Sequence, residues 1–555
     1  MRPQARHGSN RLLLLTCCVA IDLLLSTAMN PITPPGTHLP LPQTTPVKIK
    51  SSTTLPYTTN QKYRVESSTT MGEEIKKYLV GPLPAQQLLD FFFPVSELPD
   101  LGVSLFTPGC YQRTVTVQNE TCSYEHFVSF FQWILLFLHM IYIIFRVKST
   151  QKFTPNLRVV KSSSTVDSNP HSDFSFRIKP DVSVYCADSD PNVKTDSSLA
   201  EVFIKFKWSH GDNPFCDPYD ISCPHCEKPN IAKSFLHETK TANNTLGQIT
   251  SYTAAQLSSQ YHMHVYSVFI VKNMARILWW DRSGTIMMEA IHYNKSPPLT
   301  EFFHCYLVAS PGMCGKDELV SLLSPVEVVE ARQALGLGDD IQLVKLQVPG
   351  AHGPLYFITS APQATPYTPP GHATHGGPAY NILHKTKVFL KDLWRVDLLD
   401  IQAEGLTYKT LEDAKVHNIP HCLTSGDIST TDYHAMKTQI FTPIPCACHL
   451  HTHFIPHWHY SLVLNIVGSN LMTFESSYKM VTSIQDDVIG KLLQCSCRGR
   501  KLTVCIALAL MDAYDAGILH HKFSPGNIII LNDGTGRLID WDLSKPWLVQ
   551  NATPT

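Results

Sequence analysis

The chain has 555 residues, enough for more than one domain of average size, and 43% of them are hydrophobic, which is sufficient for a buried core. Its 45 lysines and arginines nearly balance its 46 aspartates and glutamates, so the composition gives no indication of a nucleic-acid partner or of a strongly acidic one. The 16 cysteines are scattered along the chain, a pattern typical of reduced thiols in an intracellular, cytoplasmic protein.

We expect residues 1–73 to be a disordered N-terminus with one apolar run inside it. Residues 12–25 follow three arginines and resemble the charged start and apolar centre of a signal peptide. However, Asp22 interrupts this run, and no small-residue cleavage site follows it. Residues 30–70 are rich in Pro, Thr and Ser and predict a linker.

Residues 74–180 predict a helical region followed by a polar linker. Within it, the run at 127–145 (FVSFFQWILLFLHMIYIIF) is apolar and is followed by two cationic residues. Nineteen residues form a helix of about 28 Å, near the thickness of a bilayer core. The cations would place the following domain in the cytoplasm. Because Gln132 and His139 interrupt the run, a helix buried in a soluble domain remains the alternative to a membrane anchor.

The elements that follow alternate between strand and helix patterns. Apolar periodicity predicts a strand at 201–208, a helix at 247–260 and three strands over 264–293, with Asp281-Arg282-Ser283-Gly284 as a hairpin turn. After a Pro, Gly and Thr loop at 361–378, we expect a strand at 388–396, a helix at 403–414, a strand at 461–467 and an apolar helix at 502–517.

The stretch from His520 to Asp542, HHKFSPGNIIILNDGTGRLIDWD, is laid out like a protein-kinase catalytic loop, its hairpin and its acidic turn. Lys522 stands where the kinase pattern has its catalytic aspartate. Asn527 follows it by five positions, and Asp540 follows Asn527 by thirteen. The two spacings predict that Asn527 and Asp540 hold Mg²⁺.

Phosphoryl transfer depends mostly on positioning and on charge neutralisation, so the remaining parts must grip phosphates. Lys391, on a predicted strand, and Glu404, thirteen residues later on a predicted helix, are the candidate lysine and its glutamate partner. The loop GHATHGG at 371–377 is a poor match to a glycine-rich loop, but Gly371 and Gly376 are the candidates to lay backbone amides over the phosphates of ATP.

On these residues the chain resembles the fungal-type protein kinase family over roughly residues 85–545. The resemblance rests on four segments: GQITSYTAAQLSSQYHMHVYSVFIV, RILWWDRSGTIMMEAI, VFLKDLWRV with AEGLTYKTLEDAKVHNIP, and GILHHKFSPGNIII with GRLIDWDL. It implies an α+β, protein-kinase-like two-lobed domain at 181–545, followed by a tail at 546–555. It also implies ATP and Mg²⁺ as cofactors and phosphorylation of protein Ser or Thr.

Two departures from the family pattern decide what we expect of this copy. A lysine ammonium at its ordinary pKa only donates a proton, so we do not expect Lys522 to accept one from a substrate hydroxyl. Only thirteen residues follow Asp542, so the second lobe is expected to be truncated, either in the protein or by an early end of the sequence. We therefore expect a pseudokinase that binds nucleotide and acts with an unknown protein substrate or active kinase partner. The alternatives are an active kinase and a membrane-tethered interaction adaptor.

Three other groupings have weaker chemical meaning. Cys446, Cys448 and five histidines lie within residues 446–459, and a CxxC pair lies among Cys216, Cys223, Cys226 and His237. Both sets have zinc-ligand chemistry, but neither has a convincing second half-site, so polar loops are favoured. Glu201 and Lys205 precede a Gln-containing helix and weakly resemble a nuclease core. This grouping lacks the ExK spacing and a metal-binding aspartate.

Overall fold

A computed structural model describes residues 61–94, 96, 98, 105–146, 157–167, 178–217, 235–362, 369–398, 401–428, 436–444, 454–470, 498–521, 523–531 and 535–546. The signal-like run at 12–25, Lys522 and most of the C-terminal tail lie outside these residues. Two seven-stranded sheets with accompanying helices organise the described chain. The predicted mixture of α and β structure is therefore confirmed.

The first sheet has the strand order β1-β7-β6-β5-β4-β3-β2. Its strands are β1 (Leu79–Leu83), β2 (Leu157–Lys161), β3 (Val182–Cys186), β4 (Ala200–Lys207), β5 (Val265–Val271), β6 (Met274–Trp280) and β7 (Thr285–Met288). The accompanying helices are α2 (Gln61–Ile75), η1 (Lys76–Tyr78), α3 (Ala85–Phe92), α4 (Gln112–Val115), α5 (Glu120–Arg146), η3 (His210–Asp212), α6 (Lys240–Ser259) and α7 (Pro298–Val308). We call the described residues between 61 and 308 the first unit.

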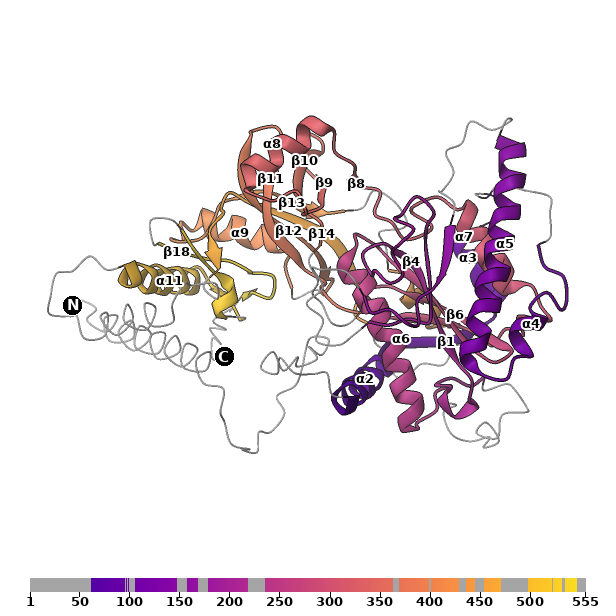
Figure 1. Ribbon diagram of the computed structural model, residues 1–555. Helices are drawn as coiled ribbons and strands as arrows, with labels where there is room; N and C mark the ends of the chain where they lie inside the picture. Colours follow the sequence, from indigo (N-terminus) through magenta and orange to yellow (C-terminus); the bar gives the residue numbers. More distant parts are fainter. Residues whose placement is uncertain are drawn as a thin grey trace, which may run out of the picture.

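Helices cover both faces of this sheet, which explains why β5 is apolar and buried along its whole length. On one face, α3, α5 and α7 contribute Phe92, Phe127 and Phe302 to the main core. On the other face, α6 contributes Leu246 and Ile249 to a second core. Figure 1 shows α6 and α5 on opposite sides of the first unit.

The sheet extends across the expected boundary between residues 180 and 181. Strand β2 pairs antiparallel with β3, and β1 pairs in parallel with β7 at the far edge. The region 74–180 is therefore not only helical: it supplies two strands of the same sheet. The pairing of β1 with β7 joins segments about 200 positions apart and leaves no local pattern, so periodicity did not predict it.

Helix α2 occupies residues that were expected to be disordered. It packs closely on α6, and the contact depends on two glycines. A Cβ at Gly72 would overlap the backbone of Asn243, and a Cβ at Gly247 would overlap the backbone of Ser68. The short distance between the two helices is therefore possible only with glycine at these positions.

The apolar run at 127–145 lies on α5. Phe127, Phe131 and Ile134 on this helix are buried in the main core, whereas Trp133 and Leu136 are exposed. No helix within the described part of the chain combines the length and the apolar character that crossing a membrane requires.

The second sheet is antiparallel throughout, in the order β13-β14-β12-β11-β10-β9-β8. Its strands are β8 (Val320–Ser321), β9 (Leu343–Val348), β10 (Leu355–Ser360), β11 (His375–Asn381), β12 (Thr386–Val396), β13 (Cys422–Asp427) and β14 (His457–Leu464). The accompanying elements are α8 (Pro325–Leu335), α9 (Glu404–Asp413), η5 (Thr438–Phe441), α11 (Arg498–Asp515) and η7 (Pro525–Asn527). Five short strands follow: β15 (Ser469–Asn470), β16 (Ile518–Leu519), β17 (Ile528–Ile530) with β18 (Gly536–Leu538), and β19 (Lys545–Pro546).

We call the described residues between 320 and 546 the second unit. Its core lies between the sheet and the helices α9 and α11, where Leu393, Tyr408, Leu462 and Ile506 pack together. In Figure 1 the second unit lies beside the first, with α11 at the opposite end of the molecule from α5.

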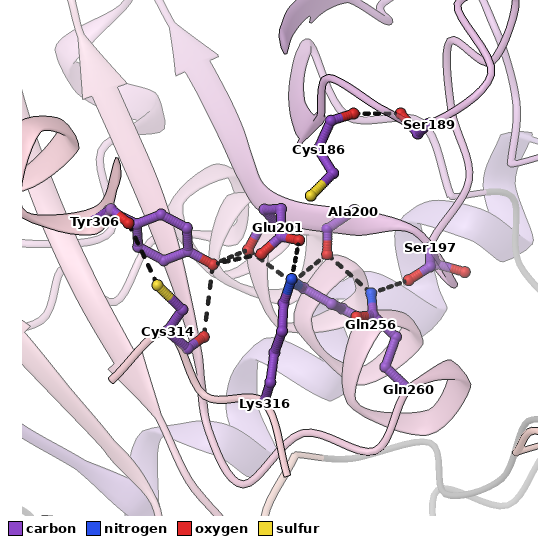
Figure 2. Close-up of polar contacts among 10 residues, drawn as sticks. All are labelled: Cys186, Ser189, Ser197, Ala200, Glu201, Gln256, Gln260, Tyr306, Cys314 and Lys316. Atoms are coloured by element: carbon purple, nitrogen blue, oxygen red, sulfur yellow. Dashed lines mark hydrogen bonds and ion pairs between the residues drawn. The ribbon is translucent and has the colours of Figure 1, made fainter. Parts of the chain in front are cut away.

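The chain passes from the first unit to the second through a connection that is held to the first sheet by polar contacts. Lys316 Nζ donates to Glu201 Oε1 at 2.7 Å, and the Tyr306 hydroxyl donates to Glu201 Oε2 at 2.9 Å. Gln256 of α6 donates to the carbonyls of Ala200 and Glu201 at 2.8 and 2.9 Å. Figure 2 shows these side chains converging on the start of β4. The connection therefore leaves the first unit at a fixed position.

Candidate functional site

Lys391 and Glu404 meet in the interior of the second unit. Lys391 lies on β12 and Glu404 is the first residue of α9; Lys391 Nζ donates to Glu404 Oε2 at 2.7 Å, and the side chains are 6% and 2% exposed. The next residue, Gly405, lets the start of α9 lie against the sheet, because a Cβ there would overlap Ser425 and Tyr460. The sequence-predicted pair is therefore brought together by local packing.

Asp540 and Asp542 follow β18 and complete the group around Lys391. Lys391 Nζ lies 2.5 Å from Asp540 Oδ1 and 3.9 Å from Asp542 Oδ2. The backbone of Asp540 has φ +70°, a left-handed conformation that few residues other than Gly, Asn and Asp adopt. Glu404 Oε1 accepts a hydrogen bond from the Trp541 amide at 3.0 Å, which fixes this turn to α9.

The group contains more negative than positive charge. Burial lowers the pKa of Lys391, but Glu404, Asp542 and Asp540 together raise it well above its usual range, so this lysine is an ammonium. The pKa of Glu404 is raised to about 7, because burial and, to a smaller extent, Asp542 and Asp540 raise it more than Lys391 lowers it. Three carboxyl groups around one ammonium favour a proton or a further cation at this site.

The segment before the acidic turn contacts residues 539 and 541 at that turn. His520 is buried, its Nε2 lies 2.9 Å from the carbonyl oxygen of Ile539, and its ring packs edge-on against Trp541. Asn527 is buried: its Oδ1 accepts from Ser524 Oγ at 3.1 Å, and its carbonyl accepts from the Ile539 amide. Asn527 is thus hydrogen-bonded to the residue that precedes Asp540, whereas the structure does not describe Lys522.

The two glycines of the predicted phosphate loop have different positions. Gly376 lies within β11, opposite Lys391 in the strand register, so the expected loop at 361–378 ends before residue 375. Gly371 has φ +124°, and its amide donates to the carbonyl oxygen of Arg282 in the first unit at 2.9 Å. Gly376 therefore lies on a strand and not in the predicted loop, whereas Gly371 lies in that loop with its amide bonded to Arg282.

Two members of the site were missed by the sequence. In the sequence pattern Asp542 is only the end of the acidic turn, and His372 is only part of the glycine-containing loop. His372 Nδ1 lies 3.9 Å from Asp542 Oδ2, and its ring packs edge-on against His457. The second aspartate of IDWD was the available signal for Asp542, but no local pattern indicated His372.

The carboxylates of this group suit a cation such as Mg²⁺. Among the described residues, Asp542 Oδ1 is buried and has no hydrogen-bond partner, so the acidic group contains an unsatisfied acceptor. In that same part of the chain, no three His, Cys, Asp or Glu side chains are grouped to hold a metal ion by themselves. Mg²⁺ in kinase sites is typically held by one or two carboxylates together with phosphates, so the donor set suits it.

The alternative sites receive no support from the described residues. Lys205 pairs with Asp181 at 2.9 Å and Glu201 pairs with Lys316, so the nuclease-like grouping consists of separate ion pairs. Of the CxxC group, Cys216 is buried, and His237 Nδ1 lies 2.8 Å from the Asn213 carbonyl oxygen. Cys223 and Cys226 lie outside the described residues, as do Cys446 and Cys448 of the other cluster.

Neither the protein-family models nor the curated proteins contain a match to this chain.

Proposed function

We propose that the second unit is a protein-kinase-like domain of the fungal type that binds ATP with Mg²⁺, and that this copy is a pseudokinase. The observation that carries the proposal is the buried contact of Lys391 with both Glu404 and Asp540. A strand lysine held by a helix glutamate, next to the aspartate of an acidic turn, is the arrangement that a kinase uses to grip phosphates and metal.

The order of the elements supports this proposal. Strands β10, β11 and β12 form an antiparallel run, α9 follows, and β14 then pairs with β12. Lys391 is thus on the third strand of the run and Glu404 is on the helix after it, in the order in which kinases carry their lysine and glutamate.

Each residue has a distinct part in binding. Lys391, oriented by Glu404, contributes positive charge toward the phosphates. Asp540 and Asn527 are the residues that would hold Mg²⁺, and the buried Asp542 adds a third carboxylate beside Lys391. When bound, the metal supplies the positive charge that offsets these carboxylates and the phosphates. The contact between Lys391 and Asp540 must loosen as the nucleotide enters, since both groups then face new partners.

The pseudokinase part of the proposal rests on Lys522. A general base must accept the proton of the substrate hydroxyl, and a lysine with an ordinary pKa is already protonated at neutral pH. Nucleotide binding does not need this base. The protein would then act as a scaffold or decoy for an active kinase.

Nucleotide binding is tested by measuring stability with and without ATP and Mg²⁺. At a nucleotide concentration a hundred times its dissociation constant, the wild-type protein should gain about 2.7 kcal/mol against unfolding. Lys391→Met should abolish this gain. Lys387→Met should retain it, because Lys387 is exposed on the same strand. No stabilisation of the wild-type protein would sink the proposal.

Catalysis is tested separately, by incubating the protein with labelled ATP, Mg²⁺ and a Ser/Thr peptide mixture. We expect no transfer of phosphate to the peptides or to the protein itself. Transfer that is lost in Asp540→Asn would show an active kinase. That outcome would overturn the pseudokinase assignment while leaving nucleotide binding in place.

A further inference from the structure

The turn between β6 and β7, Asp281-Arg282-Ser283-Gly284, is buried although it is a hairpin turn of polar residues. Asp281 Oδ1 accepts from the amides of Ser283 and Gly284 at 2.8 and 2.9 Å, which closes the turn. Asp281 Oδ2 accepts from the amides of Lys437 and Thr438 at 2.8 and 2.9 Å. One carboxylate of the first unit therefore also binds a segment of the second unit.

Arg282 extends the same contact to the segment before β11. Its side chain is fully buried and donates to the carbonyl oxygens of Pro369 at 3.2 Å and of Leu257 at 2.9 Å. Its own carbonyl accepts from the Gly371 amide at 2.9 Å. The guanidinium of Arg282 thus binds residue 369, and its backbone carbonyl binds residue 371. We call residues 369–373 the 369–373 loop.

The 369–373 loop has a conformation that suits this docked position. Gly371 has φ +124° and Ala373 has φ +43°, so two of its five residues are in the positive-φ region. Ala373 packs against Met263 of the first unit and Trp394 of β12. The carbonyl of His372 accepts from the Trp394 amide at 2.7 Å. The loop is therefore held between the two units.

The docked loop also reaches the candidate nucleotide site. His372 lies 3.9 Å from Asp542, which in turn lies 3.9 Å from Lys391. The amide of Gly371, which a phosphate loop would offer to a nucleotide, is donated to Arg282 instead. In this arrangement the loop places an imidazole beside the acidic turn and directs a backbone amide away from it.

We propose that Arg282 is a positioning residue that regulates the nucleotide site: it holds the 369–373 loop against the first unit and so restricts nucleotide binding. This proposal rests on the proposed function of the second unit. Nucleotide binds best to the molecules in which the loop has left Arg282, because only these present a free Gly371 amide and an acidic turn without His372. The apparent affinity is then reduced by the fraction of molecules with a released loop.

The two sides of the contact can be changed independently. Arg282→Gln removes the guanidinium from the side of the first unit. Gly371→Ala acts from the side of the loop, because alanine strongly disfavours φ +124°. Arg276→Gln is the matched control: Arg276 is a buried arginine of the same sheet that binds Asp217 and the Met288 carbonyl instead.

The test combines hydrogen exchange at residues 369–373 with the dissociation constant of ATP in the presence of Mg²⁺. Arg282→Gln and Gly371→Ala should both speed exchange of the Gly371 amide and lower the dissociation constant about tenfold. Arg276→Gln should lower stability without either change. A purely structural role of Arg282 would weaken binding together with stability, so a gain in affinity is the diagnostic result.

The outcomes separate this inference from the proposed function. If the wild-type protein binds ATP and both loop variants bind it equally or more weakly, the regulatory role of Arg282 is overturned and the proposed function stands. If neither the wild-type protein nor any variant binds ATP, both proposals are overturned. Should Arg282→Gln fail to fold, Gly371→Ala decides the question by the same two measurements.

Discussion

The two units of this protein bury charge in different ways. In the first unit, Asp181 pairs with Lys205 at 2.9 Å and Glu201 pairs with Lys316 of the connection at 2.7 Å, so each carboxylate has one ammonium. In the second unit, the single ammonium of Lys391 lies within 4 Å of three carboxylates. Matched pairs are complete within the fold, whereas an unmatched group requires a proton or a cation from outside. This difference is what supports the proposal that the second group is the binding site.

The largest expected effect comes from removing the single ammonium of the unmatched group. Lys391→Met leaves Glu404, Asp540 and Asp542 crowded without a cation, and we expect a loss of about 3–5 kcal/mol in the free energy of unfolding at pH 7.5. Urea denaturation measures it, with the exposed Lys387→Met as the control. A loss below about 1 kcal/mol would show that the excess of negative charge around Lys391 has little effect on stability.

Removing an ammonium from a matched pair should cost less. In Lys205→Met, Asp181 loses one partner but still accepts from the Phe206 amide at 2.8 Å. We expect a loss of about 2–3 kcal/mol by the same urea measurement, and full retention of the stabilisation by ATP and Mg²⁺. Loss of that stabilisation would mean that the two groups are not functionally distinct.

The charge excess also predicts a dependence on pH. Because the pKa of Glu404 is raised to about 7, the folded state binds more protons than the unfolded state between pH 4.5 and 7. Stability contributed by this group therefore falls as pH rises through that window.

Glu404→Gln should remove this fall. Compared with the variant, the wild-type protein should lose on the order of 2 kcal/mol between pH 4.5 and 7, measured as the difference between the two urea profiles. Parallel profiles over this range would show that Glu404 is ionised throughout. The second unit would then bury ionised carboxylates as the first unit does.

The smallest effect is expected at the junction of the two units. His459 on β14 lies 2.8 Å from Asp392 and 4.0 Å from Asp317. Burial lowers its pKa, but these two carboxylates raise it overall, against the opposing charge of Arg282. The neighbouring His375 is neutral, because burial lowers its pKa to about 4.

The stabilisation from charged His459 is therefore present below about pH 6.5 and is lost as pH rises through its raised pKa. His459→Gln should abolish that loss, which we expect to be about 1 kcal/mol in urea titrations above pH 6.5. The variant should leave the contribution of Glu404 below pH 7 unchanged. An unaltered fall in stability above pH 6.5 would exclude His459 as its source.

Local patterns predicted a large part of the fold. The strand at 201–208, the helix at 247–260, the hairpin turn at 281–284 and the strand at 388–396 all have counterparts in β4, α6, the β6–β7 turn and β12. Each of these depends on the alternation or periodicity of side chains within a few residues. What the sequence did not predict is the pairing of β1 with β7, since parallel neighbours so far apart leave no local signal.

The candidate site likewise contains one contact that the sequence predicted and others that it did not. Lys391 and Glu404 are thirteen residues apart, on a strand and on the helix that follows it, so their spacing was sufficient to predict the contact. The contact between His372 and Asp542 joins segments that are 170 positions apart, and the hold of Arg282 on Gly371 joins the two units. No spacing rule connects residues whose proximity depends on the packing of whole sheets.

By itself the sequence determined the local elements, the lysine and glutamate pair, and the lysine at position 522. Only the tertiary structure decided that three carboxylates surround Lys391, and that the turn at 281–284 holds the 369–373 loop. Periodicity and spacing relate residues that are close in the sequence. The balance of buried charge depends instead on which distant segments of the chain pack together and exclude water from the charged groups.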